Sequence, residues 1–173
     1  MKQFLFAAAG LFAFANVNAQ NTVTLNVNLK PVQTLIVTTG LNNVDLTYQT
    51  EGDYTNGVSK KMDDQLTIYS TGSYEVSVST NDATMTQGSK TMNVSSIQVI
   101  PTSGTNGPEY AIYTAQSLSN NPNTLVTSTT GAVKKQISIE YKGANANAYI
   151  DNYIAGQDPT TYTTTLTYLI VSK

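Results

Sequence analysis

The stretch NTVTLNVNL, residues 21–29, alternates apolar and polar side chains along its whole length. Valine or leucine stands at every second position, with threonine or asparagine between them. A period of two is typical of a β-strand that has one apolar face and one solvated face. Proline follows at position 31 and predicts a break before the next strand, because it has no backbone N–H to donate. The four apolar residues are Val23, Leu25, Val27 and Leu29.

The residues before this stretch predict an export signal. Lys2 supplies a short basic region, residues 4–15 form an apolar run, and Val17-Asn18-Ala19 is a small-residue cleavage site. The apolar run is about a dozen residues long, which is too short to span a bilayer. We therefore expect residues 1–19 to be a signal peptide, residues 20–31 an N-terminal extension, and residues 32–173 a single domain.

The composition after the signal favours an all-β fold. All four phenylalanines lie within the first 14 residues, so the eleven tyrosines are the only aromatic residues of the expected mature chain. Threonine, serine and asparagine make up more than a third of it, and such chains favour pleated, half-buried surfaces over helices. Cysteine is absent. A packed core or a partner must therefore supply the stability that disulfides give many exported proteins.

Strand-like runs separated by turn signals fill the expected domain. The alternation is clearest at Tyr74–Thr80 and Ile137–Tyr141. Residues 111–118 and 144–154 have room for a helical turn or two, but no long helical periodicity is present. Many short strands at this spacing predict a β-sandwich. The predicted strands are residues 32–38, 44–49, 65–70, 74–80, 94–100, 111–115, 136–141 and 162–171.

The charged and reactive residues argue against several functions. A net charge of −2 and no basic cluster longer than a pair make nucleic acid a poor candidate partner. Without histidine or cysteine, the usual general base, thiol nucleophile and transition-metal ligands are missing. We expect no catalytic residues, no cofactor and no metal, and therefore no enzyme. Glu51, Asp53, Asp63 and Asp64 have no calcium-loop spacing and are more typical of solvated loops.

The opening strand has two alternative uses. In the first, it folds back as the first strand of its own sandwich. In the second, it pairs with the sheet of a neighbouring molecule. Burying four such side chains stabilises a structure by roughly 6–12 kcal/mol before entropy is subtracted. A whole domain is stable by only about 5–15 kcal/mol. A domain whose own strand is inserted in a neighbour would therefore depend for its stability on a strand from another molecule.

Three stretches resemble a known family. Residues 21–35, NTVTLNVNLKPVQTL, resemble the mature start of major pilins of the alternate chaperone–usher class, the colonisation-factor type. Residues 161–171, TYTTTLTYLIV, are similar to the closing strand of such pilins and of related bacterial immunoglobulin-like surface sandwiches. Residues 74–83 are similar to a mid-chain strand and turn of that class. Two features depart from the pattern: the chain ends in Ser172-Lys173, and it is rich in threonine and asparagine with no arginine.

The resemblance implies an immunoglobulin-like β-sandwich with an N-terminal donor strand. Its implied function is a structural subunit of a fimbria or pilus on the cell surface, which polymerises by donor-strand exchange and supports adhesion. Its implied partners are copies of itself, a periplasmic chaperone, an outer-membrane usher and a host or surface receptor. The alternative is a monomeric secreted sandwich that binds a carbohydrate or another surface ligand. Carried over residue by residue, the donor strand supplies Val23, Leu25, Val27 and Leu29, and the acceptor groove includes Leu35, Val37, Leu166, Tyr168 and Ile170.

Overall fold

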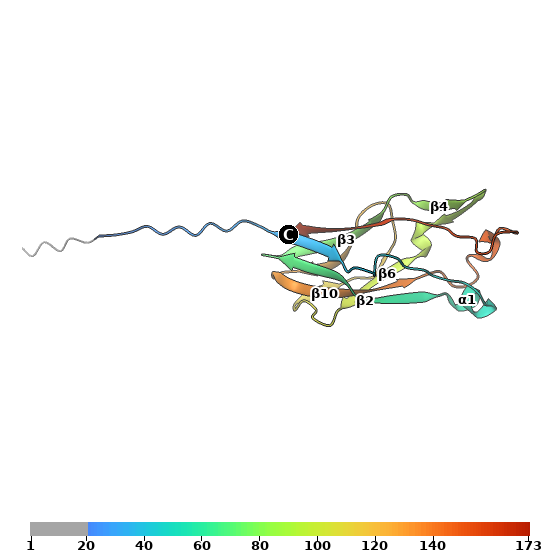
Figure 1. The fold of residues 1–173 in the computed structure, drawn as a ribbon, viewed down its shortest axis with the longest axis horizontal. Coiled ribbons are helices and arrows are strands. Elements are labelled where there is room, and N and C mark those ends of the chain that lie inside the picture. Colours follow the sequence, from blue (N-terminus) through green and yellow to red (C-terminus); the bar gives the residue numbers. More distant parts are fainter. Residues whose placement is uncertain (1–20) are drawn as a thin grey trace, which may run out of the picture.

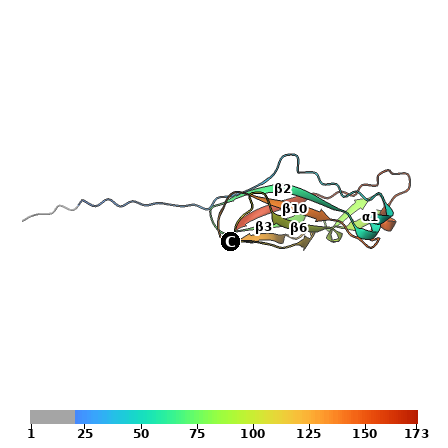
Figure 2. The same cartoon turned by 90° about the horizontal axis from the view of Figure 1, so that it is seen from below.

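The structure, a computed structural model, describes residues 21–173 and consists of two antiparallel β-sheets packed face to face (Figures 1 and 2). Sheet A has the strand order β1-β2-β10-β6-β8, and sheet B has the order β11-β3-β9-β7. A separate hairpin joins β4 to β5. The strands are β1 (Gln33–Val37), β2 (Ser59–Ser70), β3 (Tyr74–Thr80), β4 (Thr84–Gln87), β5 (Lys90–Asn93), β6 (Gln98–Ser103), β7 (Ala111–Tyr113), β8 (Gln116–Ser117), β9 (Asn123–Ser128), β10 (Ala132–Lys142) and β11 (Leu166–Ser172).

One hydrophobic core lies between the two sheets. Strands β2, β6 and β10 contribute from sheet A, and strands β3 and β9 contribute from sheet B. Leu66, Ile137, Tyr74, Val76 and Leu125 are each 0 % exposed, so the centre of the sandwich is dry and closely packed. The prediction of an all-β sandwich is confirmed.

Several predicted strand boundaries were wrong, for identifiable reasons. β3 occupies the predicted residues, but β2 begins six residues before its predicted start, because charged residues disguise its first half. The polar hairpin β4–β5 and strand β9 were not predicted. Residues 44–49 were predicted as a strand and pair with no other described strand.

The few helical turns lie at one end of the sandwich. Helix α1 (Glu51–Asn56) is capped at its N-terminus by Thr50. The Thr50 hydroxyl accepts from Asp53 N, and the Asp53 carboxylate accepts from Thr50 N in return. The 3₁₀ turns are η1 (Val94–Ser96) and η2 (Ile150–Asn152). We call the end formed by α1 and residues 143–160 the α1 end (Figure 1).

The opposite end of the sandwich is where residues 21–31 leave it, and we call it the root end. Turn 71–73, turn 129–131 and the C-terminal Ser172 and Lys173 lie here. The expected signal peptide, residues 1–19, lies outside the described residues. Within residues 21–173, no helix combines the length and the apolar character that crossing a bilayer requires.

Candidate functional site

The N-terminal extension, residues 21–31, lies outside both sheets. It forms no strand, and it runs away from the sandwich as an extended chain (Figures 1 and 2). The first residue of the described chain that bonds to the domain is Val32, whose N donates to Thr71 Oγ1 and whose O accepts from Thr71 N. The apolar side chains Val23, Leu25, Val27 and Leu29 are 93, 85, 76 and 88 % exposed. A regular apolar stripe of four residues is thus left in solvent.

Strands β1 and β11 are the edge strands on the same side of the two sheets. β1 pairs only with β2, and β11 pairs only with β3. Their inward-facing residues Leu35, Leu166 and Ile170 contact the core but are only partly buried. The residues opposite them on the neighbouring strands are buried: Ile68 on β2, opposite Leu35, is 1 % exposed, and Val76 on β3, opposite Ile170, is 0 % exposed. The core is therefore incompletely covered between β1 and β11.

The sequence-predicted acceptor residues are distributed along this side of the molecule. Leu35, Leu166, Tyr168 and Ile170 all pack against the core cluster. Val37, at the end of β1, is 36 % exposed and does not join that cluster. Four of the five candidates thus share one incompletely covered surface. The donor candidates of the same molecule lie outside this surface, in the extension that leaves the root end.

Each edge strand continues into an extended segment that has no ladder partner. After β1, residues 41–48 place Leu41, Val44, Leu46 and Tyr48 toward the sandwich, with solvent-facing side chains between them. Before β11, residues 161–165 alternate in the same way, with Tyr162 and Thr164 partly buried. Within the described chain, the backbone groups of residues 42–48 and 161–165 form no hydrogen bond. Extended backbone of this kind can pair with an additional strand.

We call these four elements together the unpaired edge: β1, residues 41–49, residues 160–165 and β11. Leu41, Val44, Leu46 and Tyr162 pack against the same core cluster as the two strands, so both sides border one apolar floor. At β1 and β11, Cα atoms of the two sides lie within 8 Å of each other. If a further strand lay between β1 and β11 and paired with both, these two strands would be about 9.5 Å apart, which is twice the usual spacing of neighbours. Full insertion of a strand therefore requires β1 to move away from β11.

A buried chain of hydrogen bonds crosses beneath the unpaired edge. The hydroxyl oxygens of Tyr168 and Tyr141 lie 2.6 Å apart, and Tyr141 donates to Gln65 Oε1 at 2.8 Å. Tyr168 must therefore be the donor to Tyr141. Gln65 Nε2 in turn donates to Leu41 O at 2.7 Å. The chain links β11, through β10 and β2, to the segment that follows β1, and it ties together the two sides of the unpaired edge.

Burial keeps the two tyrosines of this hydrogen-bond chain in their neutral form. It raises the pKa of Tyr141 and of Tyr168 above the usual value for a phenol, and the neighbouring Tyr141 hydroxyl raises the pKa of Tyr168 further. Sequence reasoning identified Tyr168 but missed Gln65 and Tyr141. Gln65 faces inward beside Leu66 because a β-bulge interrupts the pairing of β2 with β10, and Asp64 adopts a positive φ there. Simple alternation does not reveal such a position.

A cluster of tyrosines fixes the far end of the 41–49 segment. Tyr48 lies between Tyr54 and Tyr149, with ring centroids 5.4 and 5.1 Å away. Its hydroxyl donates to Ala144 O at 2.7 Å. Burial raises the pKa of Tyr48 to about 12. These contacts attach the segment to α1 and to the 143–149 loop, so its backbone is held in an extended form without a strand partner.

Three of the four acidic residues considered as calcium ligands have separate structural roles. Asp53 caps α1, Asp64 Oδ1 accepts from Thr105 N at 2.7 Å, and Asp63 forms an exposed ion pair with Lys61 at 2.7 Å. No group of three or more acidic residues in the described chain is arranged to hold a metal ion.

The fold and this site define a class: an all-β sandwich with an exposed apolar extension and an unpaired edge. No protein-family model matches the chain, and no curated protein matches it.

Proposed function

We propose that this protein is a structural subunit of a surface fimbria or pilus, in which residues 20–31 of each copy complete the unpaired edge of the next. The supporting observation is the pairing of two features in one molecule. Four alternating apolar side chains are 76–93 % exposed in the extension, and the domain has partly buried core residues beside backbone without a ladder partner. Each feature supplies what the other lacks.

Insertion of the extension into a neighbour's unpaired edge is energetically favoured over leaving both apolar surfaces in solvent. Transferring the four extension side chains from solvent to an apolar floor stabilises the assembly by roughly 6–12 kcal/mol before ordering entropy is subtracted. Pairing also satisfies the backbone groups of residues 42–48 and 161–165. Addition of a strand to a sheet edge is an established mode of assembly between subunits.

Chain direction supports a head-to-tail arrangement. β1 runs from the root end toward the α1 end, and β11 runs back toward the root end (Figure 1). If copies stack in the same orientation, an incoming extension lies parallel to β1 and antiparallel to β11. The contact is heterologous, since the extension and the edge are different surfaces, and repeating it generates an open polymer.

The proposal includes export, adhesion and assembly partners. The expected signal peptide directs the chain out of the cytoplasm, and a subunit with an uncovered edge needs protection until the next extension arrives. A periplasmic chaperone and an outer-membrane usher are the partners that the family resemblance implies. The fibre then carries adhesion to a host or another surface.

Deletion of residues 21–29 tests the proposed function in the exporting cell. We expect the wild-type protein to form ladders that resist SDS and collapse on boiling, and to form fibres visible by electron microscopy. The deleted subunit still accepts a strand but donates none, so fibres stop growing at it. A wild-type protein that gives one monomeric peak in size exclusion and no ladder would instead support the alternative, a monomeric binding protein.

A further inference from the structure

The connection between the extension and the domain is very short. Val32 is fixed to its own domain by two hydrogen bonds to Thr71, with N···O distances of 3.0 and 3.1 Å. Only Lys30 and Pro31 separate it from Leu29, the last apolar residue of the extension. Three residue steps reach at most about 11 Å. If the proposed function holds, a copy whose Leu29 lies in a neighbour's edge must therefore have its root end directly against that neighbour.

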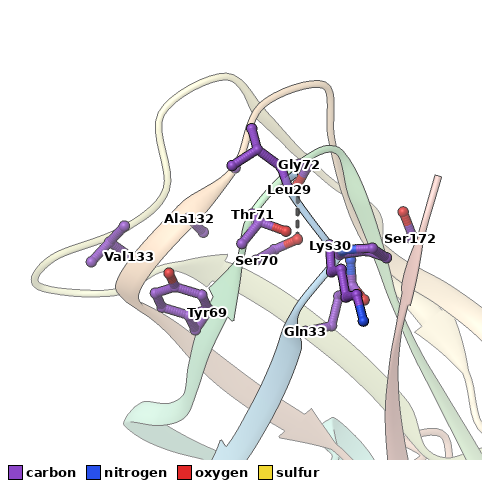
Figure 3. A pocket seen from close by; sticks show the side chains of 12 residues that line it. Leu29, Lys30, Gln33, Tyr69, Ser70, Thr71, Gly72, Ala132, Val133 and Ser172 are labelled. Atoms are coloured by element: carbon purple, nitrogen blue, oxygen red, sulfur yellow. Dashed lines mark hydrogen bonds between the residues drawn. The ribbon is translucent and has the colours of Figure 1, made fainter. Parts of the chain in front are cut away.

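The root end has a surface suited to such a contact. A pocket of about 550 Å³ opens there, and Leu29, Lys30 and Pro31, the last residues of the extension that lie before Val32, form part of its lining (Figure 3). Its wall includes Tyr69 and Val133, which are 37 and 65 % exposed, and Ala132 lies at its base. Gln33 also lines the pocket, and its Nε2 is buried with no hydrogen-bond partner in the described chain. The pocket is therefore mainly apolar and has one free donor.

The α1 end has protruding apolar side chains. Ile150, in η2, is 59 % exposed, and Tyr153, just after it, is 55 % exposed. Both belong to the 143–160 segment, which backbone bonds from Ala146 N to Thr55 O and from Asn147 N to Tyr54 O hold against α1. In the same-orientation stack, this segment is the part of the accepting copy that the root end reaches first.

The two ends differ in their balance of charged side chains, with lysines in excess at the root end and acidic residues in excess at the α1 end. The root end carries Lys30, Lys134, Lys135 and Lys173 together with Glu75, which is paired with Lys173, and the exposed Glu109. The α1 end carries the acidic residues Glu51, Asp53, Asp151 and Asp158 together with the lysines Lys60, Lys90 and Lys142, so acidic residues are in slight excess there. Opposite charges brought together at an interface favour the correct orientation and raise the rate of encounter more than they raise affinity.

We propose that the root end of each copy docks on the α1 end of the copy that accepts its extension. Ile150 and Tyr153 of the accepting copy pack against the pocket formed by Tyr69, Ala132 and Val133. Two linked contacts, the inserted strand and the docked ends, make the junction between copies stiff. With the strand alone, the polymer would bend freely at residues 30 and 31.

A disulfide experiment tests this contact, because the chain contains no native cysteine. The double variant Val133→Cys/Ile150→Cys places one thiol at each end of the sandwich, too far apart to link within one copy. We expect mild oxidation of its polymers to produce a covalent ladder that survives boiling in SDS and collapses with a reductant. The two single variants control for random linking, and so does Val133→Cys/Thr102→Cys, since Thr102 is exposed on the flank of sheet A.

The outcomes separate the two proposals. Polymers that form but give no 133–150 link would overturn the docking of the ends and leave strand exchange standing. Absence of any SDS-resistant polymer in the wild type would overturn the proposed function and the docking with it. Charge reversal supplies a second measurement that does not use thiols. Lys134→Glu should make fibres more curved in electron micrographs, and combining it with Asp151→Lys should restore straight fibres; unchanged curvature in both would count against docking.

Discussion

The hydroxyl groups of Tyr168 and Tyr141 lie 2.6 Å apart beneath the unpaired edge. Tyr168 belongs to β11, the edge strand of sheet B, and Tyr141 belongs to β10 in sheet A. Through Gln65, the pair reaches the backbone at Leu41 on the other side of the edge. This single chain of hydrogen bonds thus holds the two sides of the unpaired edge in a fixed relative position.

Tyr141→Phe should destabilise the domain by about 1–3 kcal/mol, because it leaves the Tyr168 hydroxyl and Gln65 Oε1 buried without their shared partner. Chemical denaturation of the subunit measures this loss. Tyr69→Phe is the matched control, since the Tyr69 hydroxyl forms no hydrogen bond within residues 21–173 and its side chain is 37 % exposed. Equal stabilities of the two variants would contradict the role of the hydrogen-bond chain.

Stability should fall as the pH rises above 10. The phenol of Tyr48 has a pKa near 10 in the unfolded chain and about 12 in the folded domain. Between these values the folded state holds more protons than the unfolded state, so the free energy of unfolding decreases with increasing pH. The stabilisation is complete below pH 10 and is lost through about pH 12. The raised pKa of Tyr168 acts in the same direction.

Denaturation at a series of pH values from 9 to 12 measures this dependence. Tyr48→Phe should show a shallower decrease than the wild type in identical buffers, because one group with a raised pKa has been removed. Comparing the two proteins cancels the titration of the lysines. Parallel curves would show that Tyr48 titrates alike in the folded and unfolded states.

Val27→Glu should abolish SDS-resistant ladders without unfolding the subunit. Val27 is 76 % exposed in the extension, so the change costs the isolated domain little, but it places a charge where the proposed contact is apolar. Asn26→Glu is the matched control, because the neighbouring side chain points to the opposite face of the strand. Ladders from Val27→Glu that equal those of the control would argue against insertion of the Val27 face.

Backbone amides at the unpaired edge should become protected from hydrogen exchange when copies assemble. Residues 42–48 and 161–165 have no backbone hydrogen bonds within the described chain, so they should exchange quickly in the isolated subunit. A paired donor strand gives their N–H groups acceptors. Mass spectrometry of exchanged fibres and subunits measures the change, with Val76–Val78 on β3 expected to be slow in both. Rapid exchange at both segments in the fibre would rule out pairing there.

The amino-acid sequence by itself determined the local β-structure. Alternation over Tyr74–Thr80 predicted β3 correctly, since that strand has a simple inside and outside. The same alternation predicted an extended conformation at 44–49, and those residues do alternate toward the core. The family resemblance selected Leu35, Val37, Leu166, Tyr168 and Ile170, and all of these except Val37 pack against the core.

Only the tertiary structure decided which extended segments have partners. The side-chain pattern of a strand records which face is apolar, but it does not record whether another strand lies along its edge. For that reason the prediction of a strand at residues 44–49 could not show that this segment lacks a partner, and Gln65 was not predicted to turn inward at the β-bulge. Which backbone groups remain unpaired, and which apolar residues the core leaves partly uncovered, depend on contacts between residues far apart in the chain. The unpaired edge is therefore a property of the folded domain, although every residue that forms it is individually ordinary for a β-sheet.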